Sequence, residues 1–476
     1  MKRFVGREDE LNDLKLLLKK NSASLVVIRG RRRIGKSRLI EEFCSSLPTV
    51  SLVGIPPTKH TTQASQREEF ARQLQYTLKI KKPESDDWNL LFQTLVNQTK
   101  NSRIVVVMDE ISWIGHKDPD FLGKLKNAWD LGFKQNPNLI LILCGSVASW
   151  IEDNILKSTG FVGRITLNMH LKELPIRDCA RFWDGKGCKY DPYEIFKALA
   201  VTGGIPRYLE EIMPSDSAES NIQRLCFKST GLLFNEFDSI FHDLFAERTS
   251  AYKKILLEMC DRSLFLKDVY SALGVEPSGS YSDYVDDLEQ AGFIKRDYTW
   301  DLKTGKDSLL SRFRICDNYA RFYLRCILPN QSIIKDGSYD SHSVAHRKHW
   351  NTTLSLQFET LVINNVQCLY PLLNLARGEV LRAGPFFQRK STRYKGCQID
   401  LLIQTHHRVL YLVEIKFSQN CIGTTVQREV QEKMNRIHLP RGFSVKPVLV
   451  HVNGVADSLY TDRFFSHIID FSDLLA

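Results

Sequence analysis

The sequence has no run of 18 apolar residues, which is about the length that one membrane-spanning helix needs. Residues 1–8 turn acidic at once and lack the apolar core of a signal peptide. The 11 cysteines are scattered, and they form no CxxC pair and no Cys/His cluster with zinc spacing. We therefore expect a cytoplasmic protein with reduced thiols, without a membrane span and without a structural zinc site.

The sequence also has no internal repeat and no low-complexity tract. Hydrophobic residues make up 43% and charged residues 25%, which are ordinary values for globular proteins. A chain of 476 residues is too long for one hydrophobic core, and its length predicts about three domains. The net charge of +10 favours an acidic partner such as nucleic acid, although many basic proteins merely carry a solvated positive surface.

Residues 1–240 alternate strand-length apolar runs with amphipathic helical patterns, which is typical of a parallel α/β sheet. The strand-like runs are residues 25–29, 51–55, 104–109 and 139–144. Helical patterns at 191–200 and 221–238 predict a small lid that completes this domain.

Residues 250–325 have the element order of a winged helix, which is three helices and then a hairpin. The predicted elements are helices at 251–260, 266–273 and 281–291 and strands at 293–298 and 309–315. The third helix carries four acidic residues, Asp283, Asp286, Asp287 and Glu289. Because these would repel phosphates, we expect a structural role for this unit, with any DNA contact coming from Lys303 and Lys306 in the wing.

Residues 345–476 predict a separate C-terminal α/β domain. A long helical pattern at 348–368 comes first. Strand-like runs follow at 399–404, 409–417 and 447–452, with a helix at 424–437 before the last of them.

An eight-residue segment after the first apolar run fits the phosphate-binding pattern GxxxxGK[ST]. It consists of Gly30, Arg31, Arg32, Arg33, Ile34, Gly35, Lys36 and Ser37. A strand precedes it and a helix follows, so backbone N–H groups of the loop and of the helix N-terminus can cradle the phosphates of ATP. Lys36 would reach the β- and γ-phosphates, and the Ser37 hydroxyl would ligate Mg²⁺.

The third apolar run ends in two acids, Asp109 and Glu110, about 70 residues after the phosphate loop. A buried strand would deliver Asp109 to the edge of the sheet, where it would join the Mg²⁺ site. Glu110 would then orient and deprotonate the attacking water. The two acids are weak evidence alone and strong evidence after a phosphate loop.

Several short segments resemble motifs of AAA-type and STAND ATPases. The residues at their nucleotide-contacting positions are Phe4, Val5, Arg7, Ser146, Arg164 and Pro206. The resemblance implies that the first three form an adenine-side box, that Ser146 is a polar sensor, and that Pro206 in the lid packs near adenine. Arg164 would sense or complete a nucleotide site, although it could equally be a surface or ion-paired arginine. We expect a homo-oligomer in the ATP-bound state, in which Arg164 could reach a neighbour's γ-phosphate.

Two neighbouring strand-like runs in the C-terminal part carry a second set of acids. Asp400 lies in the first run, and Glu414 and Lys416 lie late in the second. Because side chains alternate along a strand, Glu414 and Lys416 share one face. Asp400 and Glu414 could together hold a divalent ion, and Lys416 could position or activate a water for attack on a phosphodiester. Acids at strand ends are common, so the pattern alone has low specificity.

This arrangement resembles the PD-(D/E)xK nucleases, with Asp400, Glu414 and Lys416 as the defining residues. The resemblance implies Mg²⁺ or Mn²⁺ at the site. It also implies a further acidic ligand on the first helix, at Glu359, and a helping glutamine on the following helix, at Gln427. A Gln-Ile pair precedes Asp400 where the family name implies a proline.

Four basic residues lie just upstream of Asp400. They are Arg389, Lys390, Arg393 and Lys395. With an aromatic residue, Tyr394, among them, they would suit a nucleic-acid backbone, although a basic run is usually a solvated loop. Residues 341–476 contain 16 Lys and Arg against 10 Asp and Glu, so positive charge is concentrated in this part of the chain.

Nearly the full chain resembles archaeal-type ATPases with a C-terminal nuclease-like domain of the DUF234 class, and residues 315–323 are similar to their segment after the wing. The resemblance implies a P-loop ATPase with a lid at 1–240, a winged helix at 250–325 and a restriction-endonuclease-like α/β domain at 345–476. We interpret the chain as an ATP-hydrolysing switch coupled to a metal-dependent nuclease that acts on nucleic acid, with DNA favoured. The alternative is a STAND-like regulatory ATPase whose C-terminal domain binds DNA or protein without cleavage.

Overall fold

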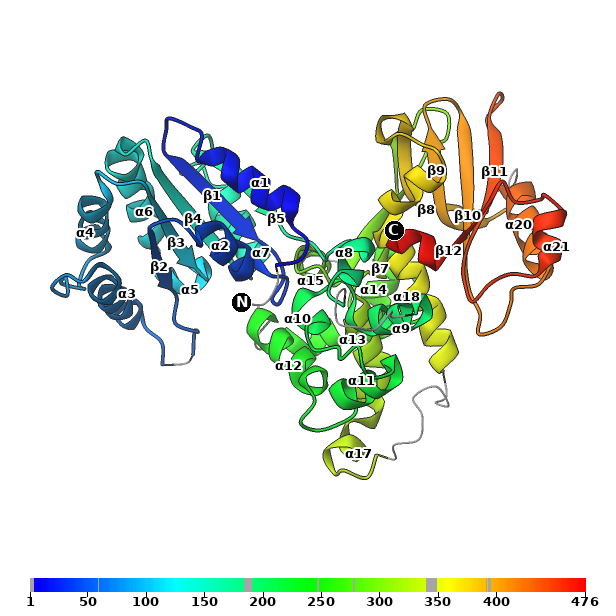
Figure 1. The fold of residues 1–476 in the computed structure, drawn as a ribbon, viewed down its shortest axis with the longest axis horizontal. Helices are drawn as coiled ribbons and strands as arrows, with labels where there is room; N and C mark the ends of the chain where they lie inside the picture. The colour runs from blue at the N-terminus through cyan, green and yellow to red at the C-terminus, as the bar shows by residue number, and fades with distance from the viewer. Residues whose placement is uncertain are drawn as a thin grey trace. The chain divides into compact units, whose positions relative to one another are not determined.

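The computed structural model describes residues 4–58, 60–183, 191–245, 248–276, 279–339, 349–390, 392 and 395–476. The chain divides into two compact units, Met1–Glu173 and Leu174–Ala476, and each contains its own five-stranded sheet (Figure 1). No helix among the described residues combines the length and the apolar character that crossing a membrane requires.

The first unit is built on a parallel sheet with the strand order β2–β3–β4–β1–β5. The strands are β1 Ser24–Arg29, β2 Thr49–Val53, β3 Ile104–Asp109, β4 Leu139–Gly145 and β5 Ile165–His170. β1, β3 and β4 are buried along nearly their whole length, which explains their continuous apolar sequences. The predicted parallel α/β sheet is confirmed. Edge strand β5 escaped prediction because it is mostly half-buried or exposed and has no apolar run.

Helices pack on this sheet and bury its apolar side chains. They are α1 Glu8–Leu17, α2 Lys36–Cys44, α3 Gln63–Leu78, α4 Trp88–Thr99, α5 Ile111–Ile114, α6 Phe121–Leu131 and α7 Ala148–Ile151. Trp88 and Phe92 on α4 stack with ring centroids 5.4 Å apart, and Phe121 on α6 meets Trp88 edge-on at 4.8 Å. This aromatic cluster belongs to the same core as the buried residues of the sheet, so it fixes α4 and α6 on the sheet.

The second unit begins with a group of helices. They are α8 Ile176–Ala180, α9 Pro192–Thr202, α10 Pro206–Leu209, α11 Ala218–Cys226 and α12 Leu232–Phe245. The predicted helix at 221–238 is in fact two helices, because the chain turns at Gly231, where a Cβ atom would lie 2.4 Å from the carbonyl oxygen of Leu225. The unit boundary falls before these helices, so the lid assigned to residues 1–240 packs within the second unit. The division into three domains stays a prediction.

Three helices and an antiparallel hairpin follow, in the predicted order. They are α13 Thr249–Met259, α14 Leu266–Leu273, α15 Gly279–Gln290, β6 Ile294–Trp300 and β7 Asp307–Ile315. The hairpin turn contains Gly305 at a φ of 70°, and this glycine lies against Leu381. Residues 277 and 278, which precede α15, lie outside the described residues. The assignment as a winged helix stays a prediction.

The C-terminal sheet has the strand order β12–β11–β10–β9–β8. β9 pairs antiparallel with both β8 and β10, whereas β11 pairs parallel with both β10 and β12. The strands are β8 Val380–Gln388, β9 Cys397–Thr405, β10 Val409–Phe417, β11 Ser444–Val452 and β12 His467–Asp470. Helix α18 (Trp350–Asn364) packs against β10, and helix α20 (Thr425–Arg436) packs against β9.

A buried hydrogen-bond cluster joins α18 to the segment after the hairpin. Arg321, on α16 (Asn318–Phe322), donates to the side chain of Gln357 at 3.2 Å and to the carbonyl oxygen of Ile315 at 2.8 Å. Burial lowers the pKa of Arg321 to about 10. The segment 315–323 therefore has a structural role, because it fixes the helix that carries Glu359.

Candidate functional site

The phosphate loop connects the carboxyl end of β1 to α2, which begins at Lys36. Gly30 has a φ of 152°, and a Cβ atom there would lie 2.5 Å from the carbonyl oxygen of Leu171, so this position requires glycine. Gly35 precedes α2 with a left-handed φ of 92°. The loop therefore has the strand–loop–helix setting that phosphate binding needs.

The side chain of Lys36 lies inside this loop. Its ammonium donates to the carbonyl oxygens of Gly30 at 2.9 Å and of Arg31 at 3.2 Å, and the residue is buried. Hydrogen bonds from this ammonium to an anionic phosphate would be stronger than its present bonds to neutral carbonyl oxygens, because hydrogen bonds between charged groups are the stronger kind. Lys36 thus presents a positive charge at the place where the phosphates are expected.

The acidic residues of the site meet at the same edge of the sheet, because β4 lies between β1 and β3 and all three strands are parallel. The Ser37 hydroxyl donates to Asp109 at 3.0 Å. Ser146, which follows β4, donates to the Glu110 carboxylate from its hydroxyl at 2.9 Å and from its backbone N–H at 3.1 Å. The structure therefore brings together the four polar residues that the sequence assigned to this end of the site.

The backbone at Glu110 is unusual. Its φ of 51° lies in the left-handed region, which costs free energy for a residue other than glycine. Gly54 packs against it so closely that a Cβ atom on Gly54 would lie 2.9 Å from the Glu110 carbonyl oxygen. Strained residues of this kind cluster at functional sites, and here the strain fixes a carboxylate at the end of β3.

These residues fit ATP with Mg²⁺. Ser37 and Asp109 are already in hydrogen-bond contact, so one ion could bind oxygens of both. A bound Mg²⁺ would neutralise charge on the phosphates. Glu110, oriented by Ser146, is the group that can accept a proton from the attacking water.

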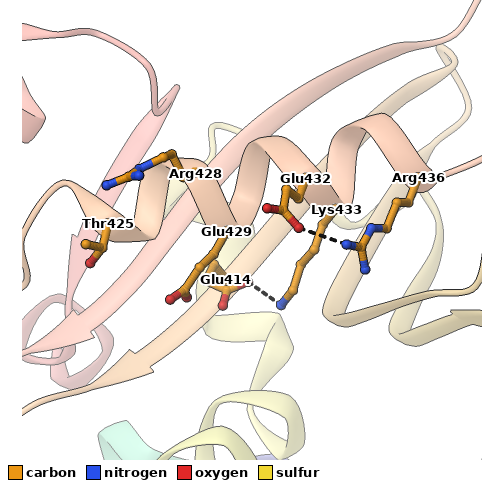
Figure 2. A pocket seen from close by; sticks show the side chains of 7 residues that line it. All are labelled: Glu414, Thr425, Arg428, Glu429, Glu432, Lys433 and Arg436. Carbon is orange, nitrogen blue, oxygen red and sulfur yellow. Dashed lines mark hydrogen bonds and ion pairs between the residues drawn. The ribbon is translucent and has the colours of Figure 1, made fainter.

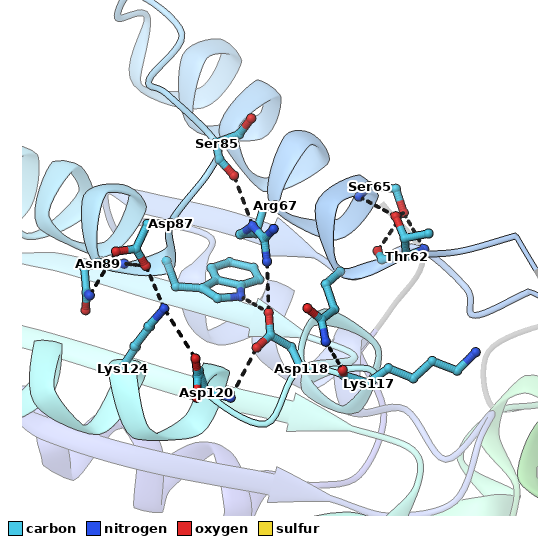
Figure 3. A network of polar contacts seen from close by, with 12 residues as sticks. Thr62, Ser65, Arg67, Ser85, Asp87, Asn89, Lys117, Asp118, Asp120 and Lys124 are labelled. Atoms are coloured by element: carbon cyan, nitrogen blue, oxygen red, sulfur yellow. Dashed lines mark hydrogen bonds and ion pairs between the residues drawn. The ribbon is translucent and has the colours of Figure 1, made fainter.

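A polar network anchors the segment that follows Glu110 (Figure 3). Asp118, between α5 and α6, accepts hydrogen bonds from Arg67 on α3 at 3.1 Å and from the indole N–H of Trp88 on α4 at 2.9 Å. Lys124 on α6 pairs with Asp87 at 2.8 Å. Because Arg67 and Asp118 are largely buried, their pair holds these helices together better than an exposed pair would.

The N-terminal segment is fastened to the phosphate loop by Arg7. This residue is buried, and its guanidinium donates to the carbonyl oxygen of Ile34 at 3.3 Å and to that of Lys172. Phe4 and Val5 lie half-buried in the same segment. The position next to the loop agrees with an adenine-side box, and the adenine contacts themselves stay predictions.

Arg164 lies at the N-terminal ends of the strands, whereas the phosphate loop lies at their carboxyl ends. This follows because Arg164 precedes β5, which runs parallel to β1. Strands of six residues place the two edges roughly 20 Å apart. Arg164 forms a two-pronged ion pair with Asp130, at 2.9 and 2.8 Å, and holds the pKa of that carboxyl well below its usual range. A contact with the nucleotide of its own chain is therefore excluded, and a role toward a neighbouring subunit stays a prediction. Pro206 begins α10 in the second unit, and its contact with adenine also stays a prediction.

The second candidate site lies in the C-terminal sheet, where Asp400 on β9 and Glu414 on β10 share one cation. The ammonium of Lys433, on α20, lies 2.5 Å from a Glu414 oxygen (Figure 2). It also lies 3.2 Å from an Asp400 oxygen. The side chains of Glu414, Asp400 and Lys433 are 6%, 19% and 24% exposed. The structure thus brings the two predicted carboxylates together, but with a lysine that the sequence argument did not assign.

Two predicted members of this site, Lys416 and Gln427, make their own side-chain contacts with other residues. The Lys416 ammonium donates to Glu429 at 2.6 Å, in a pair with both side chains exposed. The Gln427 amide donates to Asp462 at 3.3 Å, also on the surface. Lys433 contacts both carboxylates, because α20 packs against β9 and presents this lysine to them. Lys416 lies close enough to Glu414 to lower its pKa, and its catalytic role stays a prediction.

Glu359, on α18, lies close enough to the same site for the Asp400 charge to affect its pKa. Burial, and then repulsion from Asp400, raise the pKa of Glu359 to about 7. Within the described part of the chain, however, no three Asp, Glu, His or Cys side chains are placed to hold a metal ion together. The predicted three-ligand set of Glu359, Asp400 and Glu414 is therefore not formed in this conformation.

Asp400 and Glu414 alone still fit a divalent ion, because the Lys433 ammonium marks a point where one cation contacts both. Mg²⁺ in proteins is often held by only one or two carboxylates, with water and phosphate completing its shell. Burial, and then Asp400, raise the pKa of Glu414, so negative charge here is unfavourable without a cation. An ion bound at this point would polarise a phosphodiester.

The predicted basic residues are exposed where they are described. Arg389 and Lys390 line a hollow next to β8, and Lys395 is exposed nearby in sequence. Arg393 lies outside the described residues.

Sequence reasoning missed Lys433 although a signal existed. Val426 and Val430 are the buried residues of α20, and Lys433 continues their spacing of four and three residues. A lysine in line with the buried face of a helix needs a partner, and two acids on the neighbouring strands supply it.

Comparisons with known proteins agree with the first site. Residues 4–212 match a family described as an ATPase domain predominantly from Archaea. An uncharacterized protein of Methanocaldococcus jannaschii is 26% identical over 421 residues, which cover 87% of this chain and 87% of that protein. A second protein of that organism, named as an uncharacterized ATP-binding protein, is 45% identical over 40 residues, which are 8% of this chain and 68% of its own.

Among solved structures, a Walker-type ATPase of Pyrococcus abyssi has the same fold over 68% of this chain and 96% of its own, with 18% identity and a TM-score of 0.53. The matched family region contains the parallel sheet, the phosphate loop and the paired acids. Residues 4–212 are therefore an ATPase domain of the archaeal type.

Proposed function

We propose that this protein is an ATP-hydrolysing switch whose C-terminal sheet is a metal-dependent nuclease acting on nucleic acid. The observation that carries the proposal is the pair of Asp400 and Glu414, two largely buried carboxylates from neighbouring strands that share one cation position. The resemblance of this region to PD-(D/E)xK nucleases implies that the two carboxylates bind a catalytic metal ion.

Asp400 and Glu414 would hold Mg²⁺ or Mn²⁺, and Lys433 would be the basic residue of the site. In phosphodiester hydrolysis, a water gives up a proton to solvent and its oxygen bonds to phosphorus, while one ester oxygen leaves and takes up a proton. The long side chain of Lys433 can leave the carboxylates and still contact the phosphate that is attacked. This assignment replaces Lys416 with Lys433 in the role that the sequence predicts for a lysine.

The nucleotide state would govern the nuclease through assembly or packing of the chains. Arg164 supports an ATP-bound homo-oligomer, because it lies away from the phosphate loop of its own chain and is partly exposed. An arginine at that edge can reach only a nucleotide that another subunit holds.

A second candidate function is a STAND-like regulatory ATPase that binds DNA or protein without cleavage. The observation that favours it is the Lys433 ammonium itself, which neutralises both carboxylates and occupies the place of a metal ion. In that case, the acids and the lysine would form a structural ion-pair cluster.

Cleavage of labelled DNA and RNA strands with Mg²⁺ or Mn²⁺, with and without ATP, separates the two functions. We expect cleavage by the wild type and none by Asp400→Asn, since the variant loses a metal ligand and keeps its size. Asp457→Asn, outside the site, is the matched control and should cleave normally. ATP turnover should be the same in all three proteins. An inactive wild type under every condition would favour the regulatory function.

A further inference from the structure

Three adjoining hollows in the second unit have linings that extend from the hairpin β6–β7 to Glu414. The first, of about 760 Å³, is lined by residues that include Lys303, Arg408 and Arg441. The second, of about 670 Å³, is lined by residues that include Phe265, Lys267, Arg312, Arg389, Lys390 and Arg436. The third, of about 550 Å³, is lined by residues that include Arg436, Lys433 and Glu414 (Figure 2).

The hollows adjoin, because neighbouring ones share lining residues. The first and second share Gln388 and Arg389, and the second and third share Arg436. Arg436 is three residues from Lys433 on α20, which is a rise of about 4.5 Å along the helix. We call the first two hollows together the basic groove; Arg436 borders both this groove and the third hollow, which Lys433 lines.

The basic groove carries a strong excess of positive charge. Its second hollow is lined by five cationic side chains, and none of the described residues that line it is acidic. Its first hollow contains one carboxylate, Asp301, against several basic residues. Such a surface attracts a chain with regularly repeated negative charge, and each strand of DNA carries one charge per roughly 3.4 Å of helix axis.

Aromatic rings hold two of these arginines in place. The Arg312 guanidinium lies 4.5 Å from the ring centroid of Phe265 and 4.7 Å from that of Phe387. Arg389 lies over the same Phe265 ring at 5.2 Å. Burial lowers the pKa of Arg312, the nearby Asp268 carboxylate partly opposes this by raising it, and Arg389 lowers it again, so the two arginines repel each other beside one carboxylate. An anion placed between them relieves that repulsion, and the planar guanidinium groups suit phosphate oxygens.

We propose that the basic groove binds one phosphodiester strand of a nucleic acid and leads it to Lys433 and Glu414. The inference rests on the proposed function, because it names the surface that delivers the substrate to that site. It joins residues from α14, the hairpin and the C-terminal sheet, so the site is complete only when these parts pack as one unit. The expected contacts are with phosphates, so binding should depend weakly on base sequence.

The test is a binding measurement in EDTA, where metal-dependent cleavage cannot occur. The probe is a fluorescent single strand of about 16 nucleotides, the upper end of typical single-strand site sizes. The double variant Lys267→Ala/Lys390→Ala removes two exposed cations of the groove, and Lys228→Ala/Lys335→Ala removes two exposed cations elsewhere in the same unit. We expect the groove variant to bind at least about tenfold more weakly, with a salt slope smaller by about 1.4, and the control to match the wild type.

DNA and RNA probes distinguish the two sources of the strand, and either supports the groove. Equal affinity of the groove variant and the control overturns the proposal, as does a wild type that binds neither probe. An acidic peptide of equal charge that binds as tightly as the strands also overturns it in favour of a protein partner. Intact strand binding without cleavage in Mn²⁺ contradicts the proposed nuclease and leaves the groove standing, so the two failures are distinguishable.

Discussion

Replacing Lys433 by methionine tests how the C-terminal carboxylates are held. Methionine keeps an unbranched apolar side chain and removes only the ammonium and its hydrogen bonds to Glu414 and Asp400. Without that charge, two largely buried carboxylates face each other, and Glu359 adds a third acid nearby. The variant therefore isolates the cost of an uncompensated negative cluster.

The size of the effect follows from burial. Removing one partner of a fully buried ion pair costs about 3–5 kcal/mol in stability. Because Lys433 and Asp400 remain about a fifth exposed, we expect a loss of about 2–3 kcal/mol in metal-free buffer near neutral pH. Acidification should reduce the loss, since the pKa of Glu414 is already raised by burial and by Asp400, and its protonation removes one of the charges.

The same variant should respond more strongly to divalent ions. In the wild type, an entering ion must displace the Lys433 ammonium, whereas in Lys433→Met it meets two unpaired carboxylates. Mn²⁺ should therefore restore much of the lost stability and should bind the variant more tightly than the wild type.

Urea unfolding in EDTA and in Mn²⁺ measures both effects. Lys416→Met is the matched control, because its exposed pair with Glu429 should contribute less than about 1 kcal/mol. If Lys433→Met were as stable as the wild type in EDTA and indifferent to Mn²⁺, the shared-cation description of this site would be refuted.

Three further predictions concern single residues. Glu110→Gln should bind ATP normally but form ADP at least about 100-fold more slowly, because it lacks the base. Quenched-flow measurement of ADP checks this, and ADP formation at the wild-type rate would contradict it. Glu359 has a folded-state pKa of about 7 against an ordinary 4.5, so the stability of the wild type falls as pH rises between these values. Urea unfolding in EDTA above pH 7 should therefore show Glu359→Gln to be more stable than the wild type, by up to about 3 kcal/mol. Equal stability of the two proteins would refute the raised pKa. Arg164→Ala should abolish an ATP-dependent increase in mass in mass photometry, and a wild type that stays monomeric with ATP would exclude the role across subunits.

The nucleotide site could be predicted from the sequence because its signals are local. Residues 30–37 are contiguous, and Asp109 and Glu110 end an apolar run, so each part lies on one recognisable element. Their meeting follows from the topology of a parallel sheet, which brings the carboxyl ends of β1, β3 and β4 to one edge.

The remaining parts depend on packing between distant segments. Lys433 reaches Asp400 only because α20 folds back on β9, and Arg312 joins Arg389 only because the hairpin lies beside β8. Strand β8 was invisible in the sequence, because Gly384 and Pro385 read as turn residues and sit where its register shifts against β9. Gly231 likewise divided a helical pattern that periodicity alone would continue.

The dependence of strand cleavage on the nucleotide state shows whether the ATPase domain controls the nuclease. The measurement is the cleavage rate of one labelled strand in Mn²⁺ with ATP, with ADP and without nucleotide, for the wild type, Lys36→Ala and Glu110→Gln. We expect that ATP changes the rate in the wild type, that Glu110→Gln keeps the ATP-bound rate, and that Lys36→Ala does not respond to nucleotide. A rate that is the same in all three nucleotide conditions for the wild type, or no cleavage at all, would contradict an ATP-controlled nuclease.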